Sequence, residues 1–239
     1  MSLRRGDPTA HVLMNSVNRE AIESYYNLLD DTLREHSLFD SPVQIYNMDE
    51  SGIPLDPRAP DIIARRGQKK VRYRISGKKE QITMLACGNA IGQAMPPMVM
   101  FDGKNHNYQW MVGEVPGMFY GMSNKGWTDQ ELFRCAEETL PEICCRKSTP
   151  AATARQKEEV IIFCLPPHTT QDSQPLDCTV FGSLKCHWTD VCHDFQQQNA
   201  GVTISKLNFP PLSAKAWLLA LTPANIVAGF KKCRVYPYN

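Results

Sequence analysis

Residues 45–52 read Ile-Tyr-Asn-Met-Asp-Glu-Ser-Gly, a mostly apolar run that ends in two acids and a turn dipeptide. The run predicts a compact strand from Val43 to Met48 that ends at Asp49, and Ser51-Gly52 predicts a turn directly after it. Alternate side chains of a strand point to the same face, so Asn47 and Asp49 are expected to share one side of a sheet. The stretch therefore predicts a carboxylate presented at the end of a strand.

A second motif lies far along the chain, where residues 165–170 read Leu-Pro-Pro-His-Thr-Thr and residues 174–177 read Gln-Pro-Leu-Asp. The apolar run 160–165 before it predicts a strand buried on both faces. Apolar residues at helical spacing after it predict an amphipathic helix over 179–197. In isolation, Asp177 also fits the N-cap of that helix, and Asp49 also fits an acid that starts a turn.

The remaining pattern predicts strands first and helices after them, which is typical of an α/β or mixed sheet. A helix is expected over 18–36, followed by the strands 70–75, 81–87 and 98–101 and a loop over 108–126. Thr128 and Glu131 form a capping box that predicts a further helix. The last helices are expected over 213–221 and from Thr222-Pro223 to about Lys232. Residues 134–153 show neither a helical nor a strand period.

Length and composition limit the class of protein. A chain of 239 residues fits one domain with an arm, and its net charge of +1 is not that of a polycation. It has no secretory signal pattern and no apolar run of about 18 residues, so we expect neither secretion nor a membrane span. The nine cysteines are scattered, which favours thiols in a reducing, intracellular setting. Zinc ligation by Cys186, His187, Cys192 and His193 is the alternative, but these residues lack paired C-x2-C spacing.

One segment is strongly basic. Residues 58–79 carry nine basic side chains against the single acid Asp61. Taken by itself, such a segment is more simply explained as a solvated hairpin. If it binds nucleic acid, the contacts are with phosphates and largely independent of sequence. The residues expected to make them are Arg65, Arg66, Lys69, Lys70, Arg72, Arg74, Lys78 and Lys79.

Taken together, these motifs resemble the DDE-1 superfamily, the endonuclease domain of pogo-type transposases and their domesticated relatives (Tigger-derived proteins, jerky and centromere protein B). The combination of Asn-Met-Asp-Glu, Leu-Pro-Pro-His-Thr-Thr and Gln-Pro-Leu-Asp carries most of the resemblance, which covers nearly the whole chain except about 134–153. The resembling stretches are 2–5, 45–52, 79–92, 96–97, 125–127, 131–133, 165–185 and 222–239.

The resemblance implies an α/β fold with an RNase H-like mixed sheet flanked by helices, over residues 43–239, after a helical arm over 1–42. It also implies a site for Mg²⁺ ions that take part in the cleavage and transfer of DNA strands. Asp49 corresponds to the first catalytic acid of the family and Asp177 to the third. The second belongs to an Asp-Gly-His motif on a central strand. Three carboxylates hold the metal pair because Mg²⁺ prefers oxygen ligands.

The chain departs from this pattern in the middle. It contains no Asp-Gly-His and no aspartate between Asp129 and Asp172. We therefore expect one central β-strand to be missing around 134–153 and the cleavage of DNA strands to be lost. Glu142 and Glu158 are poor replacements because neither follows an apolar strand. Glu50 is expected to be a supporting or surface acid rather than a metal ligand, and His168 to be part of the loop structure rather than a general base. Arg234 replaces a residue that is usually glycine in the family.

The partner expected from the resemblance is DNA, bound weakly and without strong sequence preference, in the nucleus. The helix-turn-helix modules that read DNA in the family have no counterpart in these residues. No small-molecule substrate is expected, and protein partners stay open. Two alternatives remain: a domesticated interaction module without a nucleic-acid role, and the product of a degenerate element with no selected function.

Overall fold

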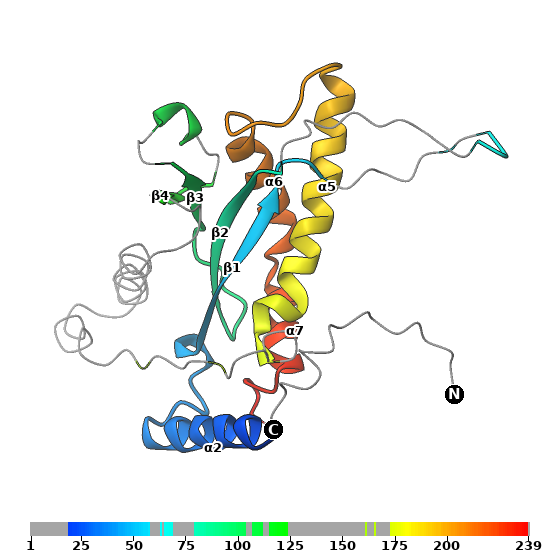
Figure 1. The fold of residues 1–239 in the computed structure, drawn as a ribbon. Coiled ribbons are helices and arrows are strands. Elements are labelled where there is room, and N and C mark those ends of the chain that lie inside the picture. Colours follow the sequence, from blue (N-terminus) through cyan, green and yellow to red (C-terminus); the bar gives the residue numbers. More distant parts are fainter. Residues whose placement is uncertain are drawn as a thin grey trace.

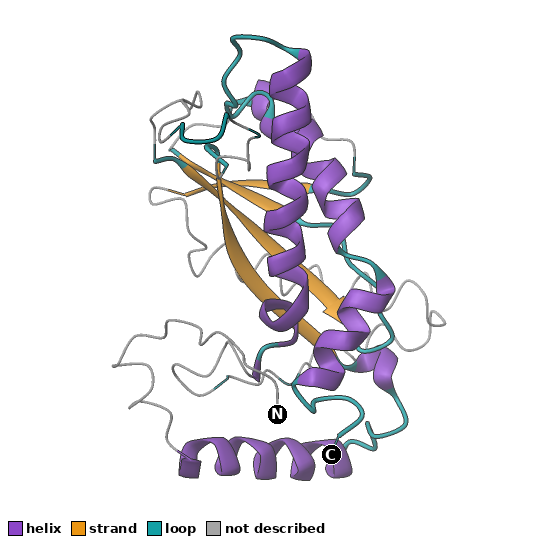
Figure 2. Ribbon diagram, turned by 90° about the vertical axis from the view of Figure 1, so that its right-hand side faces the viewer, coloured by secondary structure: helices purple, strands orange, loops and turns teal. Residues whose placement is uncertain are grey.

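The computed structural model describes residues 19–57, 63, 65–68, 79–103, 107–111, 115–123, 161, 165 and 173–238. A four-stranded sheet in the order β1-β2-β3-β4 lies against helices from the last third of the chain. Figure 1 shows β1 and β2 crossing the centre of the molecule beside α5, and Figure 2 shows α5 running along one face of the sheet. The mixed α/β sheet flanked by helices that the sequence predicts is confirmed.

β1 (Tyr46–Pro54) and β2 (Gln81–Asn89) pair antiparallel over their whole length. The prediction that Ser51-Gly52 ends the strand is wrong, because Gly52 pairs with Thr83 and the strand continues to Pro54. Beyond the glycine, Ile53 is 1% exposed, so burial of this part of β1 outweighs the local turn preference of the dipeptide. At the other end, residues 42–44 form a 3₁₀ turn, and the strand begins at Tyr46 rather than Val43.

β3 (Met98–Asp102) pairs antiparallel with β2 and parallel with β4 (Phe119–Ser123). The sequence predicted β2 and β3 but assigned β4 to a loop, because four glycines over 108–126 indicate turns. Gly121 nevertheless lies inside β4 opposite Met100, at a buried position. In the described part of the chain β1 is an edge strand, since it pairs with β2 alone.

The helices follow the predicted spacing closely. They are α2 (Arg19–Glu35), α5 (Phe181–Gln198), α6 (Phe209–Ala220) and α7 (Pro223–Lys232). α6 begins four positions earlier than predicted, because two prolines occupy its first turn, where no amide donor is needed. Thr222 caps α7 through a hydrogen bond from the Asn225 amide to its side chain.

Aromatic side chains join the layers. Phe101 on β3 packs edge-on against Phe209 of α6 at 6.2 Å between ring centroids, and Phe209 packs against Trp188 of α5 at 5.1 Å. The indole N–H of Trp188 donates to the Pro54 carbonyl at 2.8 Å, which fixes α5 to the end of β1. These rings are almost completely buried, so they form the centre of the core.

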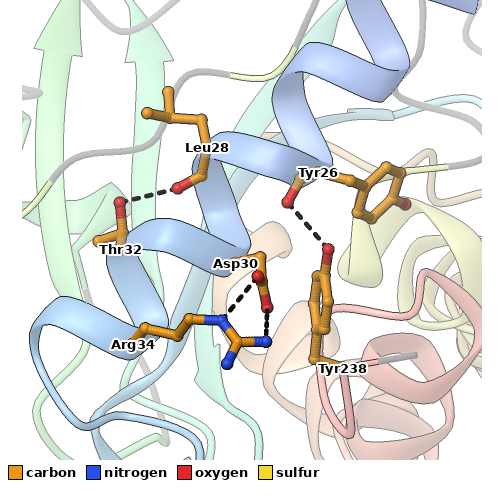
Figure 3. Close-up of polar contacts among 6 residues, drawn as sticks. All are labelled: Tyr26, Leu28, Asp30, Thr32, Arg34 and Tyr238. Atoms are coloured by element: carbon orange, nitrogen blue, oxygen red, sulfur yellow. Dashed lines mark hydrogen bonds and ion pairs between the residues drawn. The ribbon is translucent and has the colours of Figure 1, made fainter.

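α2 lies across one end of the molecule, next to the C-terminal residues (Figure 1). The Tyr26 hydroxyl donates to the Cys233 carbonyl at 2.8 Å, and the Tyr238 hydroxyl donates back to the Tyr26 carbonyl at 3.0 Å (Figure 3). On the solvent side, Arg34 forms an ion pair with Asp30 one turn away. Two reciprocal hydrogen bonds therefore join residues that lie more than 200 positions apart.

The end of α7 has the geometry of a Schellman motif. The Val235 amide donates to the Phe230 carbonyl, and the Arg234 amide donates to the Lys231 carbonyl. Arg234 occupies the position of this motif that glycine normally takes, and its φ is +55°. The left-handed conformation gives a physical reason for the glycine that the resemblance leads us to expect at this position.

Several predictions fall largely outside the described residues. They include the strand over 70–75, the helix after Thr128, the segment 134–153 and most of the run 160–165. Of that run, Ile161 and Leu165 are described and lie outside regular secondary structure, with Ile161 44% exposed. The strand buried on both faces is therefore not found at these two residues.

Candidate functional site

Asp49 and Asp177 meet, although 127 residues separate them in sequence. Asp49 lies in the middle of β1 and is half-buried, whereas Asp177 is exposed in η5 (Leu176–Val180), a π-helical turn that leads into α5. Their carboxyl groups are within hydrogen-bonding reach of each other. π-turns of this kind are frequent at functional sites. The structure thus brings together the two acids that the sequence singled out, in a place where one is partly shielded and the other open to solvent.

Two side-chain amides hold the motifs together. The Asn47 side-chain oxygen accepts a hydrogen bond from the Leu176 amide at 3.0 Å, and the Gln174 side chain donates to the Met48 carbonyl at 3.3 Å. Each amide belongs to one motif and bonds the backbone beside the acid of the other. Asn47 and Asp49 lie on one face of β1, as strand alternation predicted. The Asn-Met-Asp and Gln-Pro-Leu-Asp motifs therefore form one connected unit.

α7 supports η5 from the other side. A Cβ on Gly229 would lie 2.3 Å from the Pro175 carbonyl oxygen, so only glycine permits this close approach. The Thr179 hydroxyl donates to the Asn225 carbonyl at 2.8 Å, which adds a second link between η5 and α7. The turn that carries Asp177 is consequently held between β1 and α7.

The carboxyl groups of Asp49 and Asp177 both have a raised pKa. Burial, together with the nearby Asp177 carboxylate, raises the pKa of Asp49 to about 7. Asp177 lies at the surface, but the surrounding protein displaces part of its hydration, and this desolvation raises the pKa of its carboxyl, although Lys185 opposes the shift. Asp49 is the member that keeps a proton and donates it to Asp177. Two carboxyls that resist simultaneous ionisation are typical of catalytic and metal sites.

The oxygens of the pair are only partly used by the protein. Oδ2 of Asp49 is buried without a hydrogen-bond partner. An oxygen in that position fits a ligand for a divalent cation shared with Asp177, since hard cations take carboxylate oxygens. Within the described residues, no group of three His, Cys, Asp or Glu side chains that could hold a metal occurs. The pair thus fits two ligands of a metal site and not a complete three-carboxylate set.

Other candidate residues are placed less completely. Arg65, Arg66 and Lys79 are exposed, and the remaining basic candidates of the segment 58–79 lie outside the described residues, as do His168, Glu142 and Glu158. Glu50 follows Asp49 on β1 and contributes to the raised pKa of Asp49 by its charge, while its amide opposes this by hydrogen bonding. The zinc alternative finds no support here, since Cys192 is buried and Cys186 is exposed on the same helix.

The sequence did not identify the supporting roles of Asn47, Gln174 and Gly229. Asn47 and Gln174 belong to the two acidic motifs, but neither pattern indicated that each amide bonds the other motif. Gly229 is a glycine inside a predicted helix, and such a glycine often marks a close approach of two backbones. Of the three residues, Gly229 is therefore the one that carries a recognisable signal in the sequence.

The sequence matches a known family over more than half of its length. A family model described as "DDE superfamily endonuclease" matches residues 79–135 and 140–230, more than half of the chain. Asp177 lies within the match and Asp49 lies before it. A curated relative, the MFS-type transporter clz9 of Cochliobolus lunatus, is 24% identical over an alignment of 233 residues, which covers 85% of this chain and 24% of that protein. The chain thus spans about a quarter of the length of that relative.

A solved structure of the Mos1 transposase shares the fold. The mariner Mos1 paired-end complex with Mg has a TM-score of 0.50 and 12% identity, and the match covers 100% of this chain and 67% of that chain. The Mos1 transposase paired-end complex with the left transposon end has a TM-score of 0.48 and 12% identity, covering 98% and 65% of the two chains. The RNase H-like fold class expected from the sequence is confirmed. No helix among the described residues is long and apolar enough to cross a membrane.

Proposed function

Because the chain belongs to the DDE superfamily endonuclease family, we propose that it is a DNA-associated domain that has kept two outer carboxylates of a strand-cleavage site and lost the cleavage itself. The observation that carries the proposal is the meeting of Asp49 and Asp177 without a third acid among the described residues. The residual site is a binding site for one divalent cation rather than a complete catalytic centre.

Asp49 and Asp177 are the residues that hold the cation. The unpaired Oδ2 of Asp49 supports this role, because a buried carboxylate oxygen without a donor is stabilised by a cation. Mg²⁺ or Mn²⁺ bound there supplies Lewis-acid chemistry to a phosphate oxygen in related enzymes. In this chain the side chains of Asn47 and Gln174 orient the two carboxyls by fixing the backbone beside each of them.

Loss of cleavage follows from the number of ligands. Two metal ions need three carboxylates to balance their charge and complete their coordination. The chain has no aspartate between Asp129 and Asp172, where the second acid of the family is expected. β1, which carries Asp49, has β2 as its single partner in the described part of the sheet.

DNA is the proposed partner, and the nucleus is the proposed compartment. The exposed Arg65, Arg66 and Lys79 belong to the basic segment 58–79, whose charge suits phosphates. Such binding is weak and falls steeply with salt. Replacing Arg65, Arg66, Lys69 and Lys70 by alanine should flatten the slope of log K against log salt by about one for each phosphate that is no longer neutralised. An unchanged slope, or no duplex binding at low salt, contradicts this part of the proposal.

The decisive experiment is a nicking assay on supercoiled plasmid with Mg²⁺ or Mn²⁺. We expect no metal-dependent nicking by the wild-type protein. Nicking that disappears in Asp49→Ala and persists in the exposed-carboxyl control Asp190→Asn shows a working catalytic site and overturns the loss of activity.

Cation binding is tested separately by thermal unfolding at pH 8. Mn²⁺ should raise the Tm of the wild-type protein in a concentration-dependent way, because the ion binds the folded state. The increase should vanish in Asp49→Asn and remain in Asp190→Asn. An equal increase in all three proteins places the ion elsewhere.

A further inference from the structure

Two thiols lie in contact next to the site. Cys178 directly follows Asp177 in η5, and Cys233 is the C-cap residue of α7. The Cys233 sulfur donates a hydrogen bond to the Cys178 sulfur at 3.2 Å, although the residues are 55 positions apart in sequence. A disulfide has its sulfurs about 2.05 Å apart, so a shift of little more than 1 Å brings this pair to bonding distance.

The surrounding contacts keep the two sulfurs close to each other. η5 and α7 are already tied together by the Thr179–Asn225 hydrogen bond and by the close approach at Gly229. On the other side, the Tyr26 hydroxyl bonds the Cys233 carbonyl at 2.8 Å. Little conformational freedom is therefore lost when a covalent link forms between these elements.

The two thiols also differ in access. Cys178 is partly exposed, whereas Cys233 is 1% exposed. Lys232 places its ammonium 3.4 Å from the Cys178 carbonyl, so a positive charge lies beside the backbone of the accessible cysteine. An anionic oxidant of low molecular weight is attracted to such a position. A surface thiol next to a buried one within contact is the arrangement in which a mixed disulfide is resolved internally.

We propose that Cys178 and Cys233 form a reversible disulfide that fastens the Asp177-bearing turn to the end of α7. The oxidant is a small disulfide such as oxidised glutathione. The Cys178 thiolate attacks one sulfur of the oxidant and releases one glutathione thiolate. The Cys233 thiolate then attacks the Cys178 sulfur and expels the second. The protein loses two protons and two electrons, and the small disulfide is reduced to two thiols.

The link encloses α5, α6 and α7 in a covalent loop, so it restricts the unfolded chain strongly. Oxidation with glutathione disulfide should raise the Tm by about 5–10 °C, and dithiothreitol should reverse the rise. The mass should fall by about 2 Da for the linked pair. Stable glutathionylation of Cys178 without a link, or an unchanged mass, overturns the proposal.

Peptide mapping of the oxidised wild-type protein identifies the pair without any mutation. Cleavage after lysine should join residues 158–185 to the peptide that begins at Cys233. Because Cys164 lies in the first of these peptides, fragmentation must assign the link to Cys178. A link to Cys164, or to another cysteine, contradicts the pairing.

Variants provide the second test. Cys178→Ser should abolish the redox-dependent change in Tm, and the exposed cysteine variant Cys186→Ser should keep it. Cys178 is only partly buried, so its serine variant is the one to use rather than a variant of buried Cys233. A full redox-dependent change of Tm in Cys178→Ser shows that other thiols are responsible and refutes the Cys178–Cys233 disulfide.

Discussion

The side-chain oxygen of Asn47 accepts a hydrogen bond from the Leu176 amide at 3.0 Å. This contact joins β1 to η5 one residue before Asp177 and two residues before Asp49. Leu176 is completely buried, so no water reaches its N–H to take the place of the Asn47 side chain as acceptor.

Removing that acceptor should cost stability. Asn47→Ala leaves the buried Leu176 amide unpaired, and we expect a loss of about 2 kcal/mol, or about 4–8 °C in Tm. Thermal unfolding followed by circular dichroism measures it. The exposed amide control Gln198→Ala should change Tm by less than about 1 °C. Equal effects of the two substitutions would show that Asn47 does not brace the turn.

Asp49 should make stability depend on pH. Its pKa is raised to about 7 from an ordinary value of 3.8, so the folded state binds a proton more tightly than the unfolded state. The stability linked to this proton is fully present below about pH 4 and is lost as the pH rises to about 7.

Asp49→Asn removes the loss of stability that accompanies a rise in pH, because asparagine does not titrate. At pH 8 the variant should be more stable than the wild-type protein by about 2 kcal/mol, allowing for solvent screening, and at pH 4 the two should be equal. Denaturant unfolding at both values measures the difference. Asp190→Asn, at an exposed carboxyl, should behave like the wild-type protein at each pH. A gain that is the same at pH 4 and pH 8 would rule out titration of Asp49 as the cause.

Two glycines provide a matched pair of alanine substitutions. A Cβ at Gly229 meets the Pro175 carbonyl oxygen at 2.3 Å, whereas a Cβ at Gly182 of α5 meets nothing within 4 Å. Gly229→Ala should therefore destabilise the protein by about 3 kcal/mol because α7 and η5 must separate. Gly182→Ala should be neutral or stabilise by up to about 1 kcal/mol. Urea unfolding of both variants tests the packing of η5 on α7.

Arg234 should be better replaced by glycine. Its φ of +55° is strained for a residue with a Cβ. Arg234→Gly should stabilise by about 1 kcal/mol, which raises Tm by about 2–4 °C. Arg234→Ala removes the same guanidinium but keeps the Cβ, so it should give no such gain. If alanine stabilises as much as glycine, the charge and not the backbone is responsible.

The sequence predicted the helices well, because these depend on local pattern. Helical spacing of apolar residues placed α2, α5 and α7 within a few residues of their observed ends. Asp49 and Asp177 were identified because motif context, and not either residue alone, points to a shared site. The structure places their carboxyl groups within hydrogen-bonding reach, whereas their catalytic and metal-binding roles stay predictions.

The sequence failed where tertiary pairing decides. Ser51-Gly52 has turn chemistry, yet pairing with β2 keeps it extended. Gly121 indicates a loop, yet parallel pairing with β3 makes its segment a strand. Local residues cannot report a partner strand that comes from elsewhere in the chain, nor can they show that Asn47 and Gln174 each bond the opposite motif.

The hydrogen bonds that join Tyr26 to Cys233 and Tyr238 have a consequence for the synthesis of the protein. Cys233 and Tyr238 are synthesised 207 and 212 residues after Tyr26, so α2 leaves the ribosome well before the residues that it contacts. Until these residues have emerged, the helix has only part of its binding surface and remains marginally stable. During synthesis α2 is therefore open to chaperones and proteases until the two hydrogen bonds can form.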